Sequence, residues 1–342
     1  MKRTKIFRLA TSFLCLAFVF LCSGHALAAK KPIIFKVEHD MAPNSLVDKL
    51  WNETAERLWK SSNGELKMEI YPSISLSGGK IPTMMQNLIL GSTDIGQLGG
   101  VFSTFVPEIG LYALPFLTTG IDEMHKLTWG NELSDKLYAL AEKKGIKITS
   151  VQSRNLRQFA NNKHTIRTPE DIKGLTFRIS EDTIKVETFK AMGANPITIP
   201  FSDLPMAMST GAVDGAERPI GNLGMEAWWD LGKYITISDY SGDCEMIGIN
   251  VKKWKSLSPE HQKVLQEVLD WAAAERYVRE KKDAGDTIEL LRKNGCEVTI
   301  LTDEEKAAFA AKCKPVWDSF AKKFGQEWID LALKILDKKS PF

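Results

Sequence analysis

The stretch Leu175–Ala216, LTFRISEDTIKVETFKAMGANPITIPFSDLPMAMSTGAVDGA, decides the fold. Its first residues alternate, with Phe177 and Ile179 on the apolar face, which is typical of a half-buried strand. A helical segment follows and stops at Gly193, and the order then repeats as a strand, a helix over Ser202–Gly211 and a short strand over AVDGA. This succession of strands and helices predicts an α/β lobe.

The first part of the mature chain has the same organisation. Strands are expected in IIFKVEHD, LKMEIYP and TDIGQLG, and helices in NSLVDKLWNETAERLWKSSNG and IPTMMQNLILG, which lie between them. Because the order of elements is the same in both stretches, the sequence predicts two similar α/β lobes rather than a solenoid repeat.

A long helix is expected after the second lobe. Ser258 is its N-cap, Pro259 its first residue, and Gly295 lies just past its end. About 35 residues at 1.5 Å each give a helix of roughly 52 Å, which is longer than one small lobe. We therefore expect it to run across both lobes, followed by two helices near 303–324 and 326–337.

The N-terminus has the pattern of a secretory signal peptide over residues 1–28. Four basic residues precede an uncharged run that is too short to span a membrane, and an Ala-Leu-Ala cleavage site ends at Ala28. Its removal lowers the formal net charge from +2 to −2, which does not indicate nucleic-acid binding. We expect an exported, unanchored protein whose remaining cysteines are Cys244, Cys296 and Cys313; a Cys296–Cys313 disulfide is left open.

The motifs of common enzyme classes are absent from the sequence. It contains no Gly-x-Ser-x-Gly elbow, no phosphate-binding Gly-x-x-x-x-Gly-Lys-Ser/Thr loop and no His-Glu-x-x-His helix. The histidines that follow the signal peptide are scattered without metal-ligand spacing: His39, His125, His164 and His261. We therefore predict neither enzymatic activity nor a cofactor or metal.

Charged residues near strand ends are the candidates for ligand contacts. Arg178 points away from the apolar face of its strand, and Arg157 lies in a polar stretch that joins the lobes. Arg218 follows Glu217 directly, so it forms a surface ion pair or faces an anionic ligand. Glu38 and Asp40 end the first strand, where ligands meet open α/β sheets.

Three segments in this order resemble the solute-binding proteins of tripartite ATP-independent periplasmic (TRAP) transporters, the DctP-like family. They are NNKHTIRTPEDIKGLTFRIS, FKAMGANPITIPFSDLPMAMSTGAVDGAERP and WWDLGKYITISDY. The resemblance covers nearly the whole mature chain. It implies a two-lobed type II periplasmic binding-protein fold whose long helix spans both lobes, with lobe I at 32–153 plus about 244–283 and lobe II at 154–243 plus about 284–342. It also implies closure around an organic acid, and delivery to membrane-embedded permease subunits.

The resemblance assigns site residues one by one. Arg178 matches the principal carboxylate-binding arginine, Arg157 the second arginine, and Phe201 an aromatic residue that lines the pocket. A planar guanidinium matches a carboxylate through two parallel hydrogen bonds, which agrees with the first assignment.

Three positions depart from the family pattern. Ser180 replaces a proline, Arg218 replaces an asparagine that contacts ligand in relatives, and Gly99 and Gly100 replace a polar or acidic residue. The glycines leave room for a larger ligand or for Phe102 to turn inward.

Three guanidiniums, those of Arg157, Arg178 and Arg218, are poorly compensated by one carboxylate in a closed cleft. Either the ligand carries a second acidic group, which favours a dicarboxylate or an oxo or hydroxy acid, or Glu38, Asp40 or Glu217 neutralises one arginine. The second alternative allows a bulky monocarboxylate.

Aromatic residues are the candidates for holding such a side chain: Phe201, Trp228 and Tyr240. For Trp228 the alternative is lobe packing. A ligand sensor for a signalling receptor is the competing function.

Overall fold

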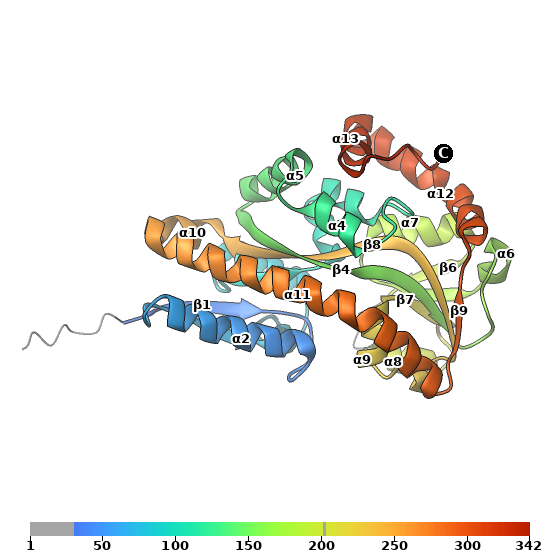
Figure 1. Ribbon diagram of the computed structural model, residues 1–342, viewed down its shortest axis with the longest axis horizontal. Coiled ribbons are helices and arrows are strands. Elements are labelled where there is room, and N and C mark those ends of the chain that lie inside the picture. The colour runs from blue at the N-terminus through green and yellow to red at the C-terminus, as the bar shows by residue number, and fades with distance from the viewer. Residues whose placement is uncertain (1–30, 201–202) are drawn as a thin grey trace, which may run out of the picture.

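The computed structural model describes residues 31–200 and 203–342 (Figure 1). Its strands are β1 (Ile33–Glu38), β2 (Leu66–Tyr71), β3 (Ile95–Leu98), β4 (Ile146–Asn161), β5 (Thr176–Ile179), β6 (Asn195–Thr198), β7 (Gly215–Pro219), β8 (Tyr234–Asn250) and β9 (Glu297–Ile300). Within the described residues they form one sheet in the order β2-β1-β3-β8-β4-β7-β5-β6, and β9 pairs with β8.

Helices cover this sheet. They are α2 (Leu46–Ser61), α3 (Ile81–Leu90), α4 (Ile121–Thr128), α5 (Glu132–Lys143), α6 (Pro169–Ile172), α7 (Thr183–Met192), α8 (Leu204–Ser209), α9 (Ile220–Met225), α10 (Val251–Ser256), α11 (Pro259–Lys293), α12 (Asp303–Phe324) and α13 (Gln326–Leu336). Short 3₁₀ helices are η1 (Pro72–Ser77), η2 (Gly100–Thr104), η3 (Pro107–Ala113) and η5 (Trp228–Asp230). The predicted helix and strand order of both halves is therefore observed.

Two long strands join the two lobes of the sheet. Lobe I is built on the parallel strands β1, β2 and β3, and lobe II on the parallel strands β5, β6 and β7. The antiparallel pair β4 and β8 runs through both, and its register shifts between Arg154 and Arg157 and again before Phe159. Arg154 pairs with Asp243 at this break, where the sequence predicts the passage between the lobes. The two-lobed α/β fold is thus confirmed.

Helix α11 crosses the molecule as predicted. The Ser258 hydroxyl accepts a hydrogen bond from the His261 backbone N–H at 3.2 Å and caps the helix, and Pro259 is its first residue. The helix packs against α2 in lobe I, against β4, and against α9 in lobe II (Figure 1). Because its ends contact different lobes, it ties them together along one face of the sheet.

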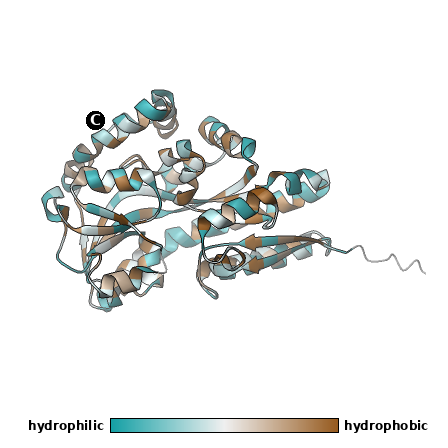
Figure 2. Ribbon diagram, turned by 180° about the vertical axis from the view of Figure 1, so that it is seen from behind, coloured by the Kyte–Doolittle hydropathy of each residue, from teal (hydrophilic) through white to brown (hydrophobic). Residues whose placement is uncertain are grey.

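Apolar residues gather between the helices and the sheet. In Figure 2 the lobe I strands are largely brown, and the long helices carry teal segments on their outer faces. Lobe I has one core between β1, β2, α2 and α11, and a second beneath α3, α4 and α5. Lobe II likewise has cores on both faces, one beneath α7 and α12 and one beneath α8, α9 and α11.

Helix α12 passes from one lobe to the other. Phe309 and Cys313 pack in the lobe II core, whereas Val316 and Phe320 pack in the lobe I core. Pro315 lies inside the helix between these two groups. A proline in a helix removes one backbone hydrogen bond, so the helix loses a bond at the point where it changes lobes.

The C-terminal segment, which the predicted division gives to lobe II over 284–342, also contacts lobe I. The Trp317 Nε1 donates a hydrogen bond to the Pro115 carbonyl at 3.0 Å, and α13 packs against α4 and α5 of lobe I. The reason is that the apolar face of α12 and α13 covers the open side of the lobe I core.

The cysteines of the described residues are buried and free. Cys296 lies in the core beneath α8 and Cys313 in the core beneath α7, so the two do not form a disulfide. Among residues 31–200 and 203–342, no helix has the length and apolar character to cross a bilayer. The predicted signal peptide and Phe201 lie outside the described residues.

Candidate functional site

Arg157 lies at the register break of β4 and is surrounded by acidic side chains. Its Nη2 donates to Glu217 Oε1 at 2.9 Å and its Nη1 to Asp243 Oδ2 at 3.0 Å, and its Nε binds Glu217 Oε2. Burial opposes the charge of Arg157, but Glu217 and Asp243 raise its pKa well above the ordinary value. Arg157 therefore joins β4 to β7 and β8 through a buried ion network.

Glu217 is the centre of this network. The observed β7 extends to Pro219, beyond the predicted AVDGA strand, because it pairs with β4 over Arg157–Asn161. Burial disfavours the charge of Glu217, which is fully buried, but Arg157 and Lys185 hold its pKa below the ordinary value. Glu217 is thus an internal counterion for Arg157.

Tyr240 is brought to the same carboxylate. Its hydroxyl donates to Glu217 Oε2 at 2.8 Å, and its ring packs against Phe159 and Phe189 with centroid distances of 5.1 and 5.5 Å. The side chain is fully buried, so its contacts in the structure position Glu217.

Sequence reasoning missed two acidic residues of β8. Asp243 Oδ2 also forms an ion pair with Arg154 Nη1 at 3.2 Å, and Glu245 Oε1 accepts a hydrogen bond from the same nitrogen at 2.7 Å. Burial raises the pKa of Glu245 to about 7 despite the nearby Arg154. The available signal is their spacing of two in SGDCEMIGIN, which puts both carboxylates on one face of a strand.

Arg178 and Arg218 form the other part of the site. The Nε of Arg178 donates to the Ile199 carbonyl at 3.0 Å, and the side chain is buried. Burial and the neighbouring charge of Arg218 lower the pKa of Arg178 to about 10. The Nε of Arg218 donates to Glu226 Oε2 at 3.0 Å, and its Nη2 binds Glu226 Oε1. Arg218 thus has a partly buried ion pair, and Glu226 is a further residue that the sequence reasoning missed.

The carboxyl end of β1 carries the predicted residues Glu38 and Asp40. Glu38 is fully buried and accepts hydrogen bonds from the Ser77 backbone N–H at 3.0 Å, the Ser77 hydroxyl at 2.8 Å and the Thr93 hydroxyl at 2.7 Å. Asp40 is exposed. The structure therefore uses Glu38 to attach η1 and the start of β3 to β1, whereas the charge of Asp40 helps to raise the pKa of Glu245, the partner of Arg154.

The predicted aromatic residues lie in the cores. Phe102 is fully buried in the lobe I core and stacks on Phe105 with a centroid distance of 5.8 Å. Trp228 is fully buried in the lobe II core beneath α8, next to Leu223. Both rings thus have packing roles in this structure, which is the alternative that the sequence leaves open for Trp228.

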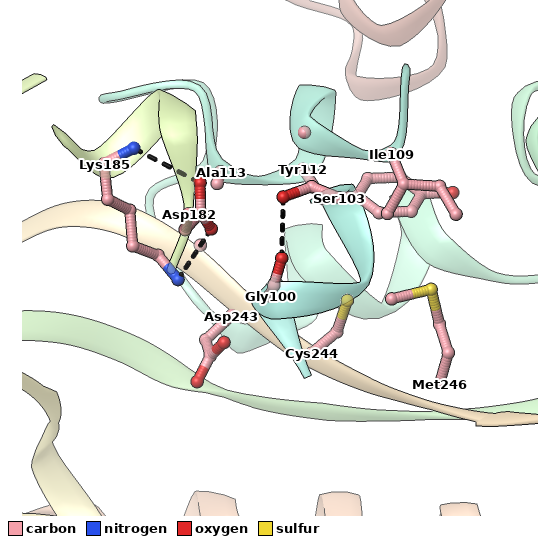
Figure 3. Close-up of a pocket in the computed structure, with 12 residues that line it drawn as sticks. Gly100, Ser103, Ile109, Tyr112, Ala113, Asp182, Lys185, Asp243, Cys244 and Met246 are labelled. Carbon is pink, nitrogen blue, oxygen red and sulfur yellow. Dashed lines mark hydrogen bonds and ion pairs between the residues drawn. The ribbon is translucent and has the colours of Figure 1, made fainter. Parts of the chain in front are cut away.

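A small cavity lies where η2 and η3 of lobe I meet the start of α7 of lobe II (Figure 3). Gly100 and Tyr112 line it from lobe I, Asp182 and Lys185 from lobe II, and Asp243 from β8. Its volume is about 20 Å³, which suits one water-sized group. Asp243 connects this cavity to Arg157, so the interlobe contact and the arginine network are adjacent.

A family model described as "Bacterial extracellular solute-binding protein, family 7", DctP, matches residues 37–323. The chain belongs to this family. The resemblance found in the sequence is confirmed, and the protein is a solute-binding protein.

Relatives with assigned ligands cover most of the chain. The 2,3-diketo-L-gulonate-binding periplasmic protein of Escherichia coli is 29% identical over 269 residues, which is 78% of this chain and 80% of the relative. The C4-dicarboxylate-binding periplasmic protein DctP of Rhodobacter capsulatus is 28% identical over 320 residues, covering 88% and 90%.

A solved structure has the same fold. The TRAP periplasmic solute-binding protein of Ralstonia eutropha, with bound (S)-2-acetolactate, has a TM-score of 0.84 and 26% identity. The match covers 90% of this chain and 99% of that one.

Proposed function

We propose that this DctP-family protein captures a small hydroxy or oxo acid with a single carboxylate, and that Arg178 binds that carboxylate. The observation that carries the proposal is the position of Arg178, buried on β5 beside the positive Arg218. Burial and the like charge of Arg218 both destabilise the guanidinium cation of Arg178. A bound anion would compensate this loss by pairing with the cation. The relative named for 2,3-diketo-L-gulonate and the solved structure with bound acetolactate support this class, because each of these oxo acids has one carboxylate.

The internal counterions favour one ligand carboxylate over two. Glu217 already neutralises Arg157, and Glu226 pairs with Arg218. Of the two alternatives that the sequence leaves open, this geometry supports the one in which an acidic residue of the protein compensates an arginine. A second ligand carboxylate would then meet these acidic side chains in a site with little water, which is unfavourable.

The remaining parts of the function follow from the family and the sequence pattern. We propose that residues 1–28 direct export and are cleaved near Ala28, and that the mature protein works in the periplasm. Closure of the two lobes on the acid presents a surface that the membrane-embedded permease subunits recognise. The acid is released unchanged, so the protein is not an enzyme.

A thermal unfolding screen tests the ligand class. We expect 2,3-diketo-L-gulonate or acetolactate to raise the midpoint by several degrees at about 1,000 times Kd, and succinate to leave it unchanged. A shift produced by succinate alone would show that the ligand brings a second carboxylate. Recovery of a chemically altered acid after incubation would contradict the non-enzymatic function.

Replacement of Arg178 tests the site. Arg178→Ala removes the proposed carboxylate partner in a desolvated cleft, so affinity is expected to fall by about 2–5 kcal/mol, or roughly 30-fold to several thousand-fold. Arg167→Ala is the matched control, because the Arg167 side chain is half exposed and pairs with Glu305 outside the site. Isothermal titration with the acid that gives the largest thermal shift measures both. A folded Arg178→Ala protein with unchanged affinity would refute the site.

A further inference from the structure

The first turn of α7 carries a buried ion pair between Asp182 and Lys185, next to the arginine network. Asp182 caps the helix by accepting from the Ile184 and Lys185 backbone N–H groups at 3.1 and 3.3 Å. The Nζ of Lys185 lies 3.0 Å from Asp182 Oδ2. Both residues are 2% exposed. A lysine is rarely buried so completely, and here its charge is matched within the same helical turn.

Two glycines of lobe I, Gly100 and Gly110, pack directly against this turn. A Cβ atom at Gly100 would lie 2.7 Å from Lys185 Nζ and 2.8 Å from Asp182 Oδ2. A Cβ atom at Gly110 would lie 2.9 Å from Ile184 Cγ1. These separations are shorter than any ordinary contact, so a larger residue at either position would displace the helix or its side chains.

The contact joins the two lobes rather than two parts of one. The Ile184 side chain belongs to the lobe I core, although α7 follows the lobe II strand β5. Figure 3 shows the Asp182–Lys185 pair beside Gly100, with Asp243 of the shared strand β8 below. The space beside Gly100, one of the two glycines at which the sequence expects room for a larger ligand or for Phe102, is therefore occupied by a lobe II ion pair.

We propose that Gly100 and Gly110 form a docking recess for the first turn of α7, and that this contact sets the closed arrangement of the lobes. The inference extends the two-lobed capture of the proposed function. Because Asp182 and Lys185 neutralise each other within lobe II, closing brings no unpaired charge against lobe I. Ile184 adds apolar contact with the lobe I core. Gly100 is thus a positioning residue that acts on the acid only through closure.

Distances between spin labels on the two lobes test the proposal without any acid. Labels are attached through Lys60→Cys on α2 and Glu170→Cys on α6, and the replaced side chains are 77% and 73% exposed. Helix α2 lies at the lower left of the molecule and α6 at its right edge (Figure 1). Gly100→Ala is expected to lower the ratio of the compact to the extended population about 5- to 150-fold, the range for overpacking a filled site.

Gly99→Ala is the matched control. No atom lies within 4 Å of a Cβ atom at Gly99, and its φ of −80° suits alanine. Its distance distribution is expected to equal that of the wild type. If Gly100→Ala also matches the wild type, or if the wild type lacks the compact distance, the proposal is overturned.

A second pair of substitutions tests whether the effect of Gly100→Ala comes from its contact with Asp182 and Lys185 or from a general disturbance of the structure. Asp182→Ser with Lys185→Ala removes both facing atoms, leaves no lone buried charge and keeps a residue that caps helices well. In this background Gly100→Ala is expected to change the population ratio less than about twofold, since nothing remains for the new Cβ to strike. An equal loss in both backgrounds would overturn the proposal. Because no acid is added, a protein that ignores every acid in the screen can still give the expected result.

Discussion

Arg157 and Arg178 lie two strands apart in the same sheet, yet their surroundings are opposite. Arg157 binds Glu217 and Asp243, and its pKa is raised. Arg178 is buried beside Arg218, and its pKa is lowered to about 10. Two arginines that the sequence presents as ligand contacts therefore have different surroundings: Arg157 has internal counterions between β4, β7 and β8, and Arg178 is the one that we propose binds an external anion.

The largest expected effect is on stability when Arg157 is removed. Arg157→Ala leaves Glu217 and Asp243 with one fewer cation in a buried site, so the free energy of unfolding is expected to fall by about 3–5 kcal/mol. Urea denaturation measures it, with the half-exposed Arg167→Ala as the control, for which a loss under about 1 kcal/mol is expected. If Arg157→Ala is as stable as the control, Arg157 has no structural role that distinguishes it from Arg178.

A smaller effect is expected from Glu217→Gln, which keeps the shape but not the charge. Hydrogen bonds to charged groups contribute about 1.5–3 kcal/mol, and this is the expected loss at pH 7. The folded-state pKa of Glu217 is depressed, so its stabilisation is present above the unfolded-state pKa and is lost as the pH falls through the folded-state pKa. The gap in unfolding free energy between the wild type and the variant should therefore close on acidification. A gap that is constant with pH would contradict the ionised state of Glu217.

The smallest effect is expected from Tyr240→Phe. The ring contacts with Phe159 and Phe189 remain, and one hydrogen bond to Glu217 is lost, so the cost in stability is about 0.5–1.5 kcal/mol. Titration with the acid from the thermal screen shows whether the hydroxyl also serves binding. If the free energy of binding falls by more than the free energy of unfolding, the Tyr240 hydroxyl contacts the ligand and does not serve only the Arg157 network.

Local patterns predict the elements well. Ser258 and Pro259 mark the start of α11, and the alternation of Phe177 and Ile179 places Arg178 off the apolar face. These signals arise from neighbours in the chain, so the sequence contains them directly.

The pairings within the site depend on distant parts of the chain. Glu217 is 60 residues from Arg157, and Asp243 is 86 residues away. The register of β4 with β7 and β8 brings them together, and no local pattern encodes that register. The aromatic character of Phe102 and Trp228 suits a core as well as a pocket, so the sequence alone does not separate the two.

The path of α12 through Pro315 has a consequence for the order of folding. The lobe I core beneath α3, α4 and α5 contains residues that lie far apart in the chain, the first being Ile74 and the last Leu336. Trp317 and Phe320 of α12 belong to it. A chain that emerges N-terminus first therefore has every strand of this lobe available before the helices that seal its core arrive. Such late, long-range contacts slow folding and leave apolar surface exposed in the meantime. We therefore expect the core of lobe I to reach its native packing only after α12 and α13 have docked.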